Sequence, residues 1–176
     1  MISNKNINLR VVEKSDLNLI QEWRNCEDIQ PFVREYRELS MIHINEWYDS
    51  IILNSKFIFF IIEDAKKNPI GITGLTYIDW VNRHADLHLG IYEMQWGDIE
   101  LGTVIIDTML NHGFNTLGLN KIYAEVYEND INKIDLFNKN KFSKDADLRE
   151  HYFHKGKFIS SYIFSILKSS YQTNLI

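Results

Sequence analysis

The chain has little cysteine, proline or glycine. Cys26 is the only cysteine among 176 residues, so the sequence excludes an internal disulfide and a metal centre held by several cysteines, and it suits a reducing compartment. There are two prolines and eight glycines, and no tract is rich in serine and glycine or in one charge. These absences exclude a recognisable linker, repeat or low-complexity segment, and we expect a single domain over residues 1–176.

Charge of one sign and long apolar runs are also lacking. Lysine and arginine total 19 against 24 aspartate and glutamate, which gives a net charge of −5 and no electrostatic footprint for a nucleic-acid backbone. No apolar run reaches the roughly 18 residues that cross a bilayer, and the first residues lack the apolar core of a signal peptide. We therefore expect a cytoplasmic protein with no membrane or nucleic-acid partner.

What the sequence does contain is a succession of periodic segments. Alternating residues predict strands at 7–12, 57–63, 70–78, 84–92 and 121–127, and a closing hairpin near 152–167. Helical spacing predicts helices from Ser15 to Asn25, from Ser40 to Ile51, over 102–117 and over 131–137. The tail after Lys168 is expected to fray.

The segment at 84–92 carries the polar side chains of most interest. Alternation places Asp86, His88, Gly90 and Tyr92 on one face of this strand. His84 shares that face, which raises the question of a metal site. In a regular strand, however, the side chains of His84 and His88 stand about 13 Å apart and cannot bind one ion, so we expect no metal.

Residues 89–142 carry a family resemblance. They read LGIYEMQWGDIELGTVIIDTMLNHGFNTLGLNKIYAEVYENDINKIDLFNKNKF, an order of strand, Trp-Gly turn, helix, strand and Asn-led helix. This order resembles the acetyl-CoA-binding half of the GNAT N-acetyltransferases. The resemblance implies an α/β (α+β) fold with a mixed, mostly antiparallel central sheet flanked by helices, and acetyl-CoA as the acetyl donor without a metal.

The same resemblance implies which residues contact the coenzyme. The pantetheine arm would lie beside the strand end formed by Leu89, Gly90, Ile91 and Tyr92, and the pyrophosphate beside Trp96, Gly97, Gly102 and Thr103. This loop departs from the family pattern, because Asp98 and Glu100 place two acids near the expected phosphates.

The second half of the resemblance implies further contacts to pantetheine. They would come from Asn129, Asp130 and Asn132. Phe137 stands where the family often has a tyrosine that protonates the departing thiolate. Phe137 also continues an apolar helical stripe with Ile134, which favours a place in the core.

Two residues of the central strand are candidates for proton transfer. We predict His88 as the base that receives the proton of the incoming amine, with Asp86 on the same face, because histidine normally titrates at a pKa of about 6.5. The alternative is that His88 is a structural histidine.

The front half of the chain supplies the acceptor pocket in folds of this kind. Arg24, Asn25, Tyr77 and Trp80 are the candidates here: arginine binds phosphate or carboxylate through paired hydrogen bonds, and aromatic rings can wall a pocket. Arg34 and Arg37 could act similarly, although we favour a surface role for both.

The acceptor is expected from a more distant likeness. Among GNAT enzymes the chain resembles those that N-acetylate nucleotide-linked amino sugars, especially in the pseudaminic-acid pathway, and also the ribosomal-protein N-terminal acetyltransferases. The first likeness implies transfer from acetyl-CoA to a sugar 4-amine by direct attack in a ternary complex. The alternatives are a peptide N-terminal acetyltransferase and a non-catalytic acyl-CoA-binding module. The expected partner is a small-molecule amine, and we allow for a homodimer.

Overall fold

The structure is a computed structural model that describes residues 2–4, 7–29, 32, 37–92 and 99–173. Its centre is an eight-stranded sheet with the order β1-β2-β3-β4-β5-β6-β8-β7. The strands are β1 (Ile2–Asn4), β2 (Ile7–Val11), β3 (Ile58–Asp64), β4 (Pro69–Asp79), β5 (His84–Ile91), β6 (Lys121–Tyr127), β7 (Ser143–His154) and β8 (Lys157–Leu167). All neighbours pair antiparallel except β5 and β6, which are parallel. The predicted mixed, mostly antiparallel sheet is confirmed.

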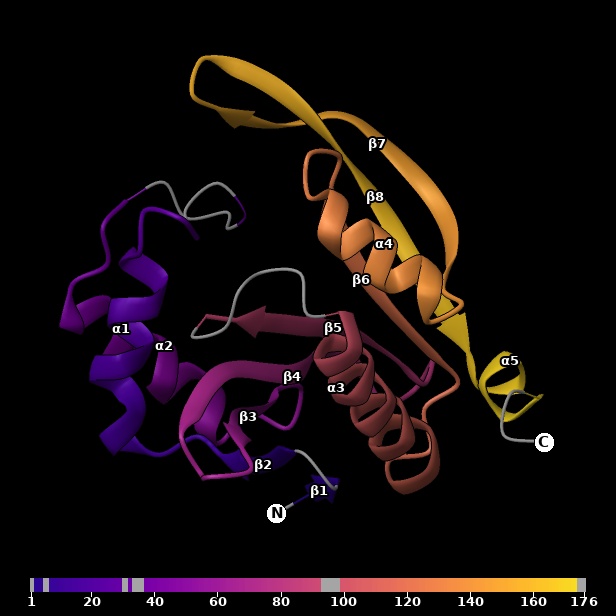
Figure 1. Ribbon diagram of the computed structural model, residues 1–176, viewed down its shortest axis with the longest axis horizontal. Helices are drawn as coiled ribbons and strands as arrows, with labels where there is room; N and C mark the ends of the chain where they lie inside the picture. Colours follow the sequence, from indigo (N-terminus) through magenta and orange to yellow (C-terminus); the bar gives the residue numbers. More distant parts are fainter. Residues whose placement is uncertain (1, 5–6, 30–31, 33–36, 93–98, 174–176) are drawn as a thin grey trace.

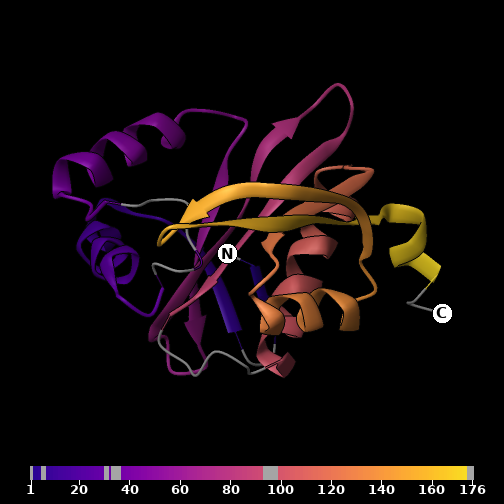
Figure 2. The same cartoon turned by 90° about the horizontal axis from the view of Figure 1, so that it is seen from above.

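Helices cover both faces of the sheet (Figures 1 and 2). One face carries α1 (Leu17–Asn25), which follows the short turn η1 (Lys14–Asp16), and α2 (Met41–Ile52). The other carries α3 (Ile99–Asn111), the π-helical turn η3 (His112–Thr116) and α4 (Ile131–Lys139). The last helix is α5 (Lys168–Thr173). None of the described helices is both long and apolar enough to cross a membrane.

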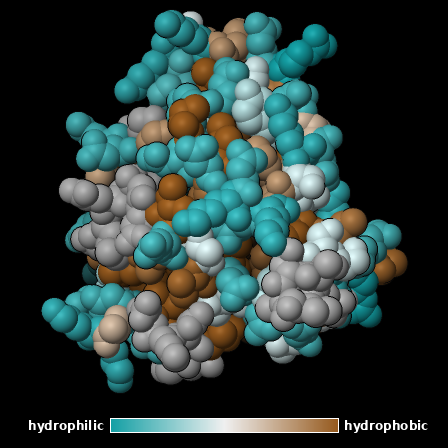
Figure 3. All heavy atoms as spheres, turned by 45° about the vertical axis from the view of Figure 1, so that its right-hand side comes forward, coloured by the Kyte–Doolittle hydropathy of each residue, from teal (hydrophilic) through white to brown (hydrophobic). Residues whose placement is uncertain are grey.

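Two apolar cores follow from the two covered faces. The larger core joins Ala85, Leu87 and Leu89 of β5 to the buried sides of α3 and α4. The smaller core joins Ile61 and Ile72 of the sheet to α1 and α2. Successive strand residues point to opposite faces, so the residues of β5 that alternate with Ala85, Leu87 and Leu89 face α1 and α2. In the space-filling view, hydrophilic side chains cover much of the surface and apolar ones show between them (Figure 3).

The sheet divides between its two parallel strands. Residues His84–Asp86 of β5 pair with Lys121–Tyr123 of β6, and the described register ends there. Beyond this point β5 continues beside β4 and β6 continues beside β8. The divergence, visible in Figure 1, opens a gap in the sheet whose two walls are strand edges.

Several predicted boundaries differ from the observed ones. α1 begins at Leu17, because Ser15 lies inside the turn η1 instead of capping the helix; this turn is held by the buried carboxylate of Asp16, which accepts the Glu13 backbone N–H at 2.8 Å. α3 begins at Ile99, three residues before the expected start. The closing hairpin is longer than predicted and spans β7 and β8. Gly118 follows η3 with φ +70°, as expected for the glycine that ends a helix.

Candidate active site

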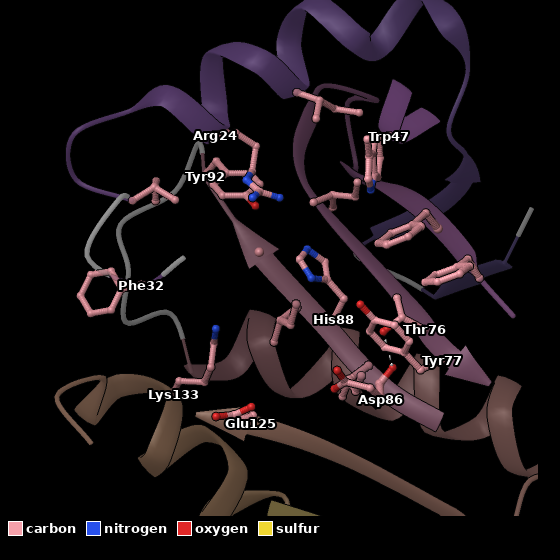
Figure 4. A pocket seen from close by; sticks show the side chains of 18 of the residues that line it. Arg24, Phe32, Trp47, Thr76, Tyr77, Asp86, His88, Tyr92, Glu125 and Lys133 are labelled. Carbon is pink, nitrogen blue, oxygen red and sulfur yellow. Dashed lines mark hydrogen bonds between the residues drawn. The ribbon is translucent and has the colours of Figure 1, made fainter. Parts of the chain in front are cut away.

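A cavity of about 430 Å³ lies under α1 and α2 where β5 and β6 diverge. Its lining comes from both helices, from β3 to β6 and from the start of α4, and includes Arg24, Tyr77, Asp86, His88, Glu125 and Lys133 (Figure 4). The volume lies within the range of small-molecule sites. The fold thus brings polar residues from five segments to one cavity.

Strand β5 contributes polar residues to the lining of this cavity. Asp86, His88 and Gly90 line it, while the alternate residues of β5 are buried in the larger core. Thr73 on β4 donates its hydroxyl hydrogen bond to the His88 carbonyl at 2.8 Å and holds the two strands in register. The facing predicted for Asp86 and His88 is confirmed.

His88 lies deep in the cavity, with its ring 5.5 Å from that of Phe59 in an edge contact. Burial, together with the positive charges of Arg24 and Lys133, lowers the pKa of His88 to about 3. A group with so low a pKa stays neutral near neutral pH and is a weak base. The ordinary pKa on which we based the prediction of His88 as the base does not hold in this environment.

The cavity contains charges of both signs. Asp86 on β5 and Glu125 on β6 bring carboxylates from the two diverging strands, and Glu125 accepts a hydrogen bond from Ser161. Lys133 extends from α4, with its Nζ 3.7 Å from an Asp130 carboxylate oxygen. The Nε of Arg24 is buried and has no hydrogen-bond partner among the described residues.

The end of β5 is closed by an aromatic residue. The Tyr92 N–H donates to the Ile70 carbonyl at 2.9 Å, and its ring stacks on Trp23 with centroids 5.0 Å apart. The Tyr92 hydroxyl lies above Gly90, where an added Cβ would come within 2.3 Å of it. Glycine at position 90 therefore leaves room for the tyrosine in the cavity.

The predicted coenzyme residues occupy several kinds of environment. Leu89 is buried in the larger core, and Ile91 packs against that core. Trp96 and Gly97 lie outside the described residues. Gly102 lies inside α3, where a Cβ would meet a Leu136 methyl at 2.8 Å, so it allows α3 and α4 to approach closely. Thr103 donates its hydroxyl to the Ile99 carbonyl at 2.7 Å.

The predicted coenzyme residues around α4 also differ in burial and contacts. Asp130 is buried and caps α4 by accepting the Lys133 N–H at 3.1 Å, and it lines the cavity. Asn129 and Asn132 are exposed. Phe137 is 1% exposed, with its ring 4.7 Å from Phe142. Phe137 therefore lies in the core and not in the cavity, which corrects its inclusion among the coenzyme contacts.

Two of the four predicted acceptor residues do not line the cavity. Arg24 and Tyr77 do. The Asn25 side chain instead exchanges hydrogen bonds with the backbone of Leu39, at 2.9 and 2.7 Å, and ties α1 to the segment before α2. The Trp80 Nε1 donates to the Ser55 carbonyl at 3.1 Å. The structure therefore does not bring Asn25 and Trp80 to the cavity, because both side chains have structural partners elsewhere.

Two further polar residues named from the sequence, Arg37 and His84, do not line the cavity. Arg37 is exposed, and Arg34 lies outside the described residues. His84 Nε2 is 3.7 Å from an Asp79 oxygen. Over the described part of the chain, no group of three His, Cys, Asp or Glu side chains is arranged to hold a metal ion.

Glu125 and Lys133 line the cavity but were not predicted from the sequence as site residues. Alternation along β6 buries Ile122, Ala124 and Val126 and turns Glu125 to the opposite face, so the strand pattern contained a signal. That signal could not indicate the cavity, because the divergence of β5 and β6 is visible only in the assembled sheet.

The chain is similar in sequence to known acetyltransferases. The acetyltransferase (GNAT) domain model matches residues 6–143. Spermidine N(1)-acetyltransferase of Vibrio cholerae is 28% identical over 168 residues, which cover 96% of each chain. An uncharacterized N-acetyltransferase, p20 of Bacillus licheniformis, is 29% identical over 94% of each chain.

Solved structures give the same result. The Vibrio cholerae spermidine N-acetyltransferase in complex with CoA and spermine matches with a TM-score of 0.89 at 28% identity, over 96% of this chain and 99% of that one. A dodecameric structure of that enzyme has a TM-score of 0.83 at 26% identity, over 97% and 99%. These relatives are named for spermidine, so they do not support the finer likeness to amino-sugar or ribosomal-protein acetyltransferases.

Proposed function

The chain belongs to the GNAT acetyltransferase family and is an acetyl-CoA-dependent N-acetyltransferase, and we propose that the cavity between β5 and β6 holds the primary amine of a small acceptor for direct attack on the thioester. The observation that carries this proposal is the pair of carboxylates, Asp86 and Glu125, on the two diverging strands. Carboxylates attract an ammonium group into a partly dry site.

The chemistry then requires removal of a proton from nitrogen. The amine lone pair attacks the thioester carbon, the carbon–sulfur bond breaks, and CoA leaves as a thiolate. We assign Asp86 as the group that binds the ammonium and receives its proton, directly or through water, as the carbon–nitrogen bond forms, because its carboxylate lines the cavity at the proposed position of the amine. A thiol pKa of about 8.5 lets the thiolate leave without full protonation, so the missing hydroxyl at Phe137 is tolerated.

The names of the relatives make spermidine and spermine the first acceptors to test. A nucleotide-linked amino sugar and a peptide N-terminus are the acceptors expected from the sequence, and neither has support from these relatives. A homodimer remains our prediction for the assembly. The dodecameric Vibrio structure supports self-association, which sedimentation velocity would test.

The test is acetyl transfer by the purified chain to each of these acceptors, with the product identified by mass spectrometry. We expect an N-acetylated product with at least one amine, and a kcat/KM about 100- to 10,000-fold lower for Asp86→Asn. Asp49→Asn, on the exposed side of α2, is the matched control and should match the parent. Binding of acetyl-CoA without any acetylated product would instead support a non-catalytic acyl-CoA-binding module.

A further inference from the structure

We propose that Arg24 binds an anionic group of the acceptor, so that the preferred acceptor is a primary amine that also carries a carboxylate or a phosphate. This inference rests on the proposed function, because it assumes that the cavity is the acceptor site. It makes a plain polyamine a poorer acceptor than an amine that bears an anion.

The first observation concerns the Nε atom of Arg24. Its Nε is buried without a hydrogen bond among the described residues, and its guanidinium group points into the cavity beside Tyr92 (Figure 4). A buried donor without a hydrogen bond destabilises the folded chain, and a bound acceptor oxygen would remove that cost. The planar guanidinium group matches the geometry of carboxylate and phosphate oxygens. An anion from a bound molecule would satisfy Arg24.

The second observation is the contrast with the other cation of the cavity. Lys133 has a carboxylate nearby, since its Nζ lies 3.7 Å from Asp130, whereas Arg24 has no carboxylate partner in the described part of the chain. The charge of Arg24 is also felt inside the cavity. Burial raises the pKa of Tyr92 and Arg24 opposes that rise, and Arg24 adds to the lowering of the His88 pKa by burial.

The third observation is the position of Arg24 relative to Asp86. Asp86, His88 and Gly90 follow one another along β5, and Tyr92 comes just after its end. Arg24 lies beside Tyr92, away from Asp86 (Figure 4). An acceptor with an ammonium near Asp86 and an anion at Arg24 would match both ends. A polyamine in the same orientation would bring a second ammonium toward Arg24 and be repelled.

The test uses acceptors matched in size that differ in the anion. We would compare γ-aminobutyrate with butylamine for the carboxylate, glucosamine phosphate with glucosamine for the phosphate, and spermidine as the plain polyamine. The anionic member of at least one pair should have the higher kcat/KM. Which pair shows the larger difference identifies the anion.

The variant Arg24→Gln should remove this preference. We expect its kcat/KM for the preferred anionic amine to fall roughly 10- to 100-fold, mainly through KM, as for a lost hydrogen bond to a charged group. The kcat/KM for the neutral amine should change less, so that the ratio of the anionic to the neutral kcat/KM falls. Arg24→Lys keeps the charge but loses the paired hydrogen bonds. Its kcat/KM for the anionic amine should lie between the values of the parent and of Arg24→Gln. Arg149→Gln, on the exposed surface of β7, is the matched control.

Three results would overturn the inference. One is equal use of anionic and neutral amines by the parent chain, and another is a preference for spermidine that Arg24→Gln does not change. The third is an Arg24→Gln effect confined to the KM for acetyl-CoA, which would place the arginine at the coenzyme. If no amine is acetylated, the proposed function itself fails. The inference is then decided by the thermal unfolding midpoint, which γ-aminobutyrate or glucosamine phosphate must raise in the parent but not in Arg24→Gln.

Discussion

Phe137 offers a sharp test of how this chain departs from its family. Phe137→Tyr would restore the residue type that the resemblance leads one to expect at this position. In the structure, however, the ring is 1% exposed and packs against Phe142 at 4.7 Å and Phe164 at 6.0 Å between centroids. The added hydroxyl would therefore enter an apolar core and not the cavity.

The cost follows from that environment. A hydroxyl buried without a hydrogen-bond partner costs about 1 to 3 kcal/mol in proteins. For a chain of this length, each 1 kcal/mol corresponds to roughly 2 to 4 °C in the unfolding midpoint. We therefore expect Phe137→Tyr to lower the midpoint by roughly 2 to 12 °C, with no gain in kcat.

The assay combines calorimetry with acetyl transfer at a temperature where both proteins are folded. Phe137→Leu is the comparison, because it removes ring contacts without adding a polar atom. An unchanged midpoint for Phe137→Tyr together with a tenfold or larger rise in kcat would refute the reasoning, since the hydroxyl would then reach the thioester.

Three further predictions concern charge and close packing. Arg10→Ala should lower the free energy of unfolding by about 2 to 3 kcal/mol in urea titrations, because it leaves the buried carboxylates of Asp16 and Glu63 unpaired while Arg10 itself is partly exposed. Burial opposes ionisation of Asp16, but hydrogen bonds from Arg10 hold the pKa of Asp16 below its usual value. The loss of unfolding free energy in Arg10→Ala should therefore persist at neutral pH and shrink below about pH 4. A loss that grows in acid would contradict this explanation. With a His88 pKa of about 3, His88→Gln should keep the shape of the kcat/KM profile between pH 5 and 8, and an inflection near pH 6.5 that disappears in the variant would restore His88 as the base. Gly90→Ala places a methyl 2.3 Å from the tyrosine hydroxyl above it, which should raise the acceptor KM and lower stability by about 1 to 2 kcal/mol, and unchanged values would show that the ring moves away freely.

Much of the fold could be predicted because the deciding signals are local. In β6, alternation of Ile122, Ala124 and Val126 with polar residues predicted the strand with the bounds that the structure shows. Ser40 before a helical stripe predicted the start of α2. Alternation in β5 also predicted which side of the strand carries Asp86 and His88.

What could not be predicted depends on contacts between distant residues. The tail was expected to fray, yet it forms α5, where Tyr171 donates to Asp107 at 3.0 Å and Lys168 donates to the Phe114 carbonyl at 2.9 Å. The pKa of His88 depends on burial and on charges from α1 and α4, none of which its own strand reveals. The structural partner of Asn25 is likewise visible only once the chain is folded.

The most direct test of the account is the initial-rate pattern for the best acceptor, with acetyl-CoA and the amine both varied. Direct attack within the cavity requires both molecules to be bound together, and it predicts double-reciprocal lines that intersect. Parallel lines, with an acetylated protein isolated in the absence of acceptor, would contradict it, because the acetyl group would then pass through a covalent intermediate.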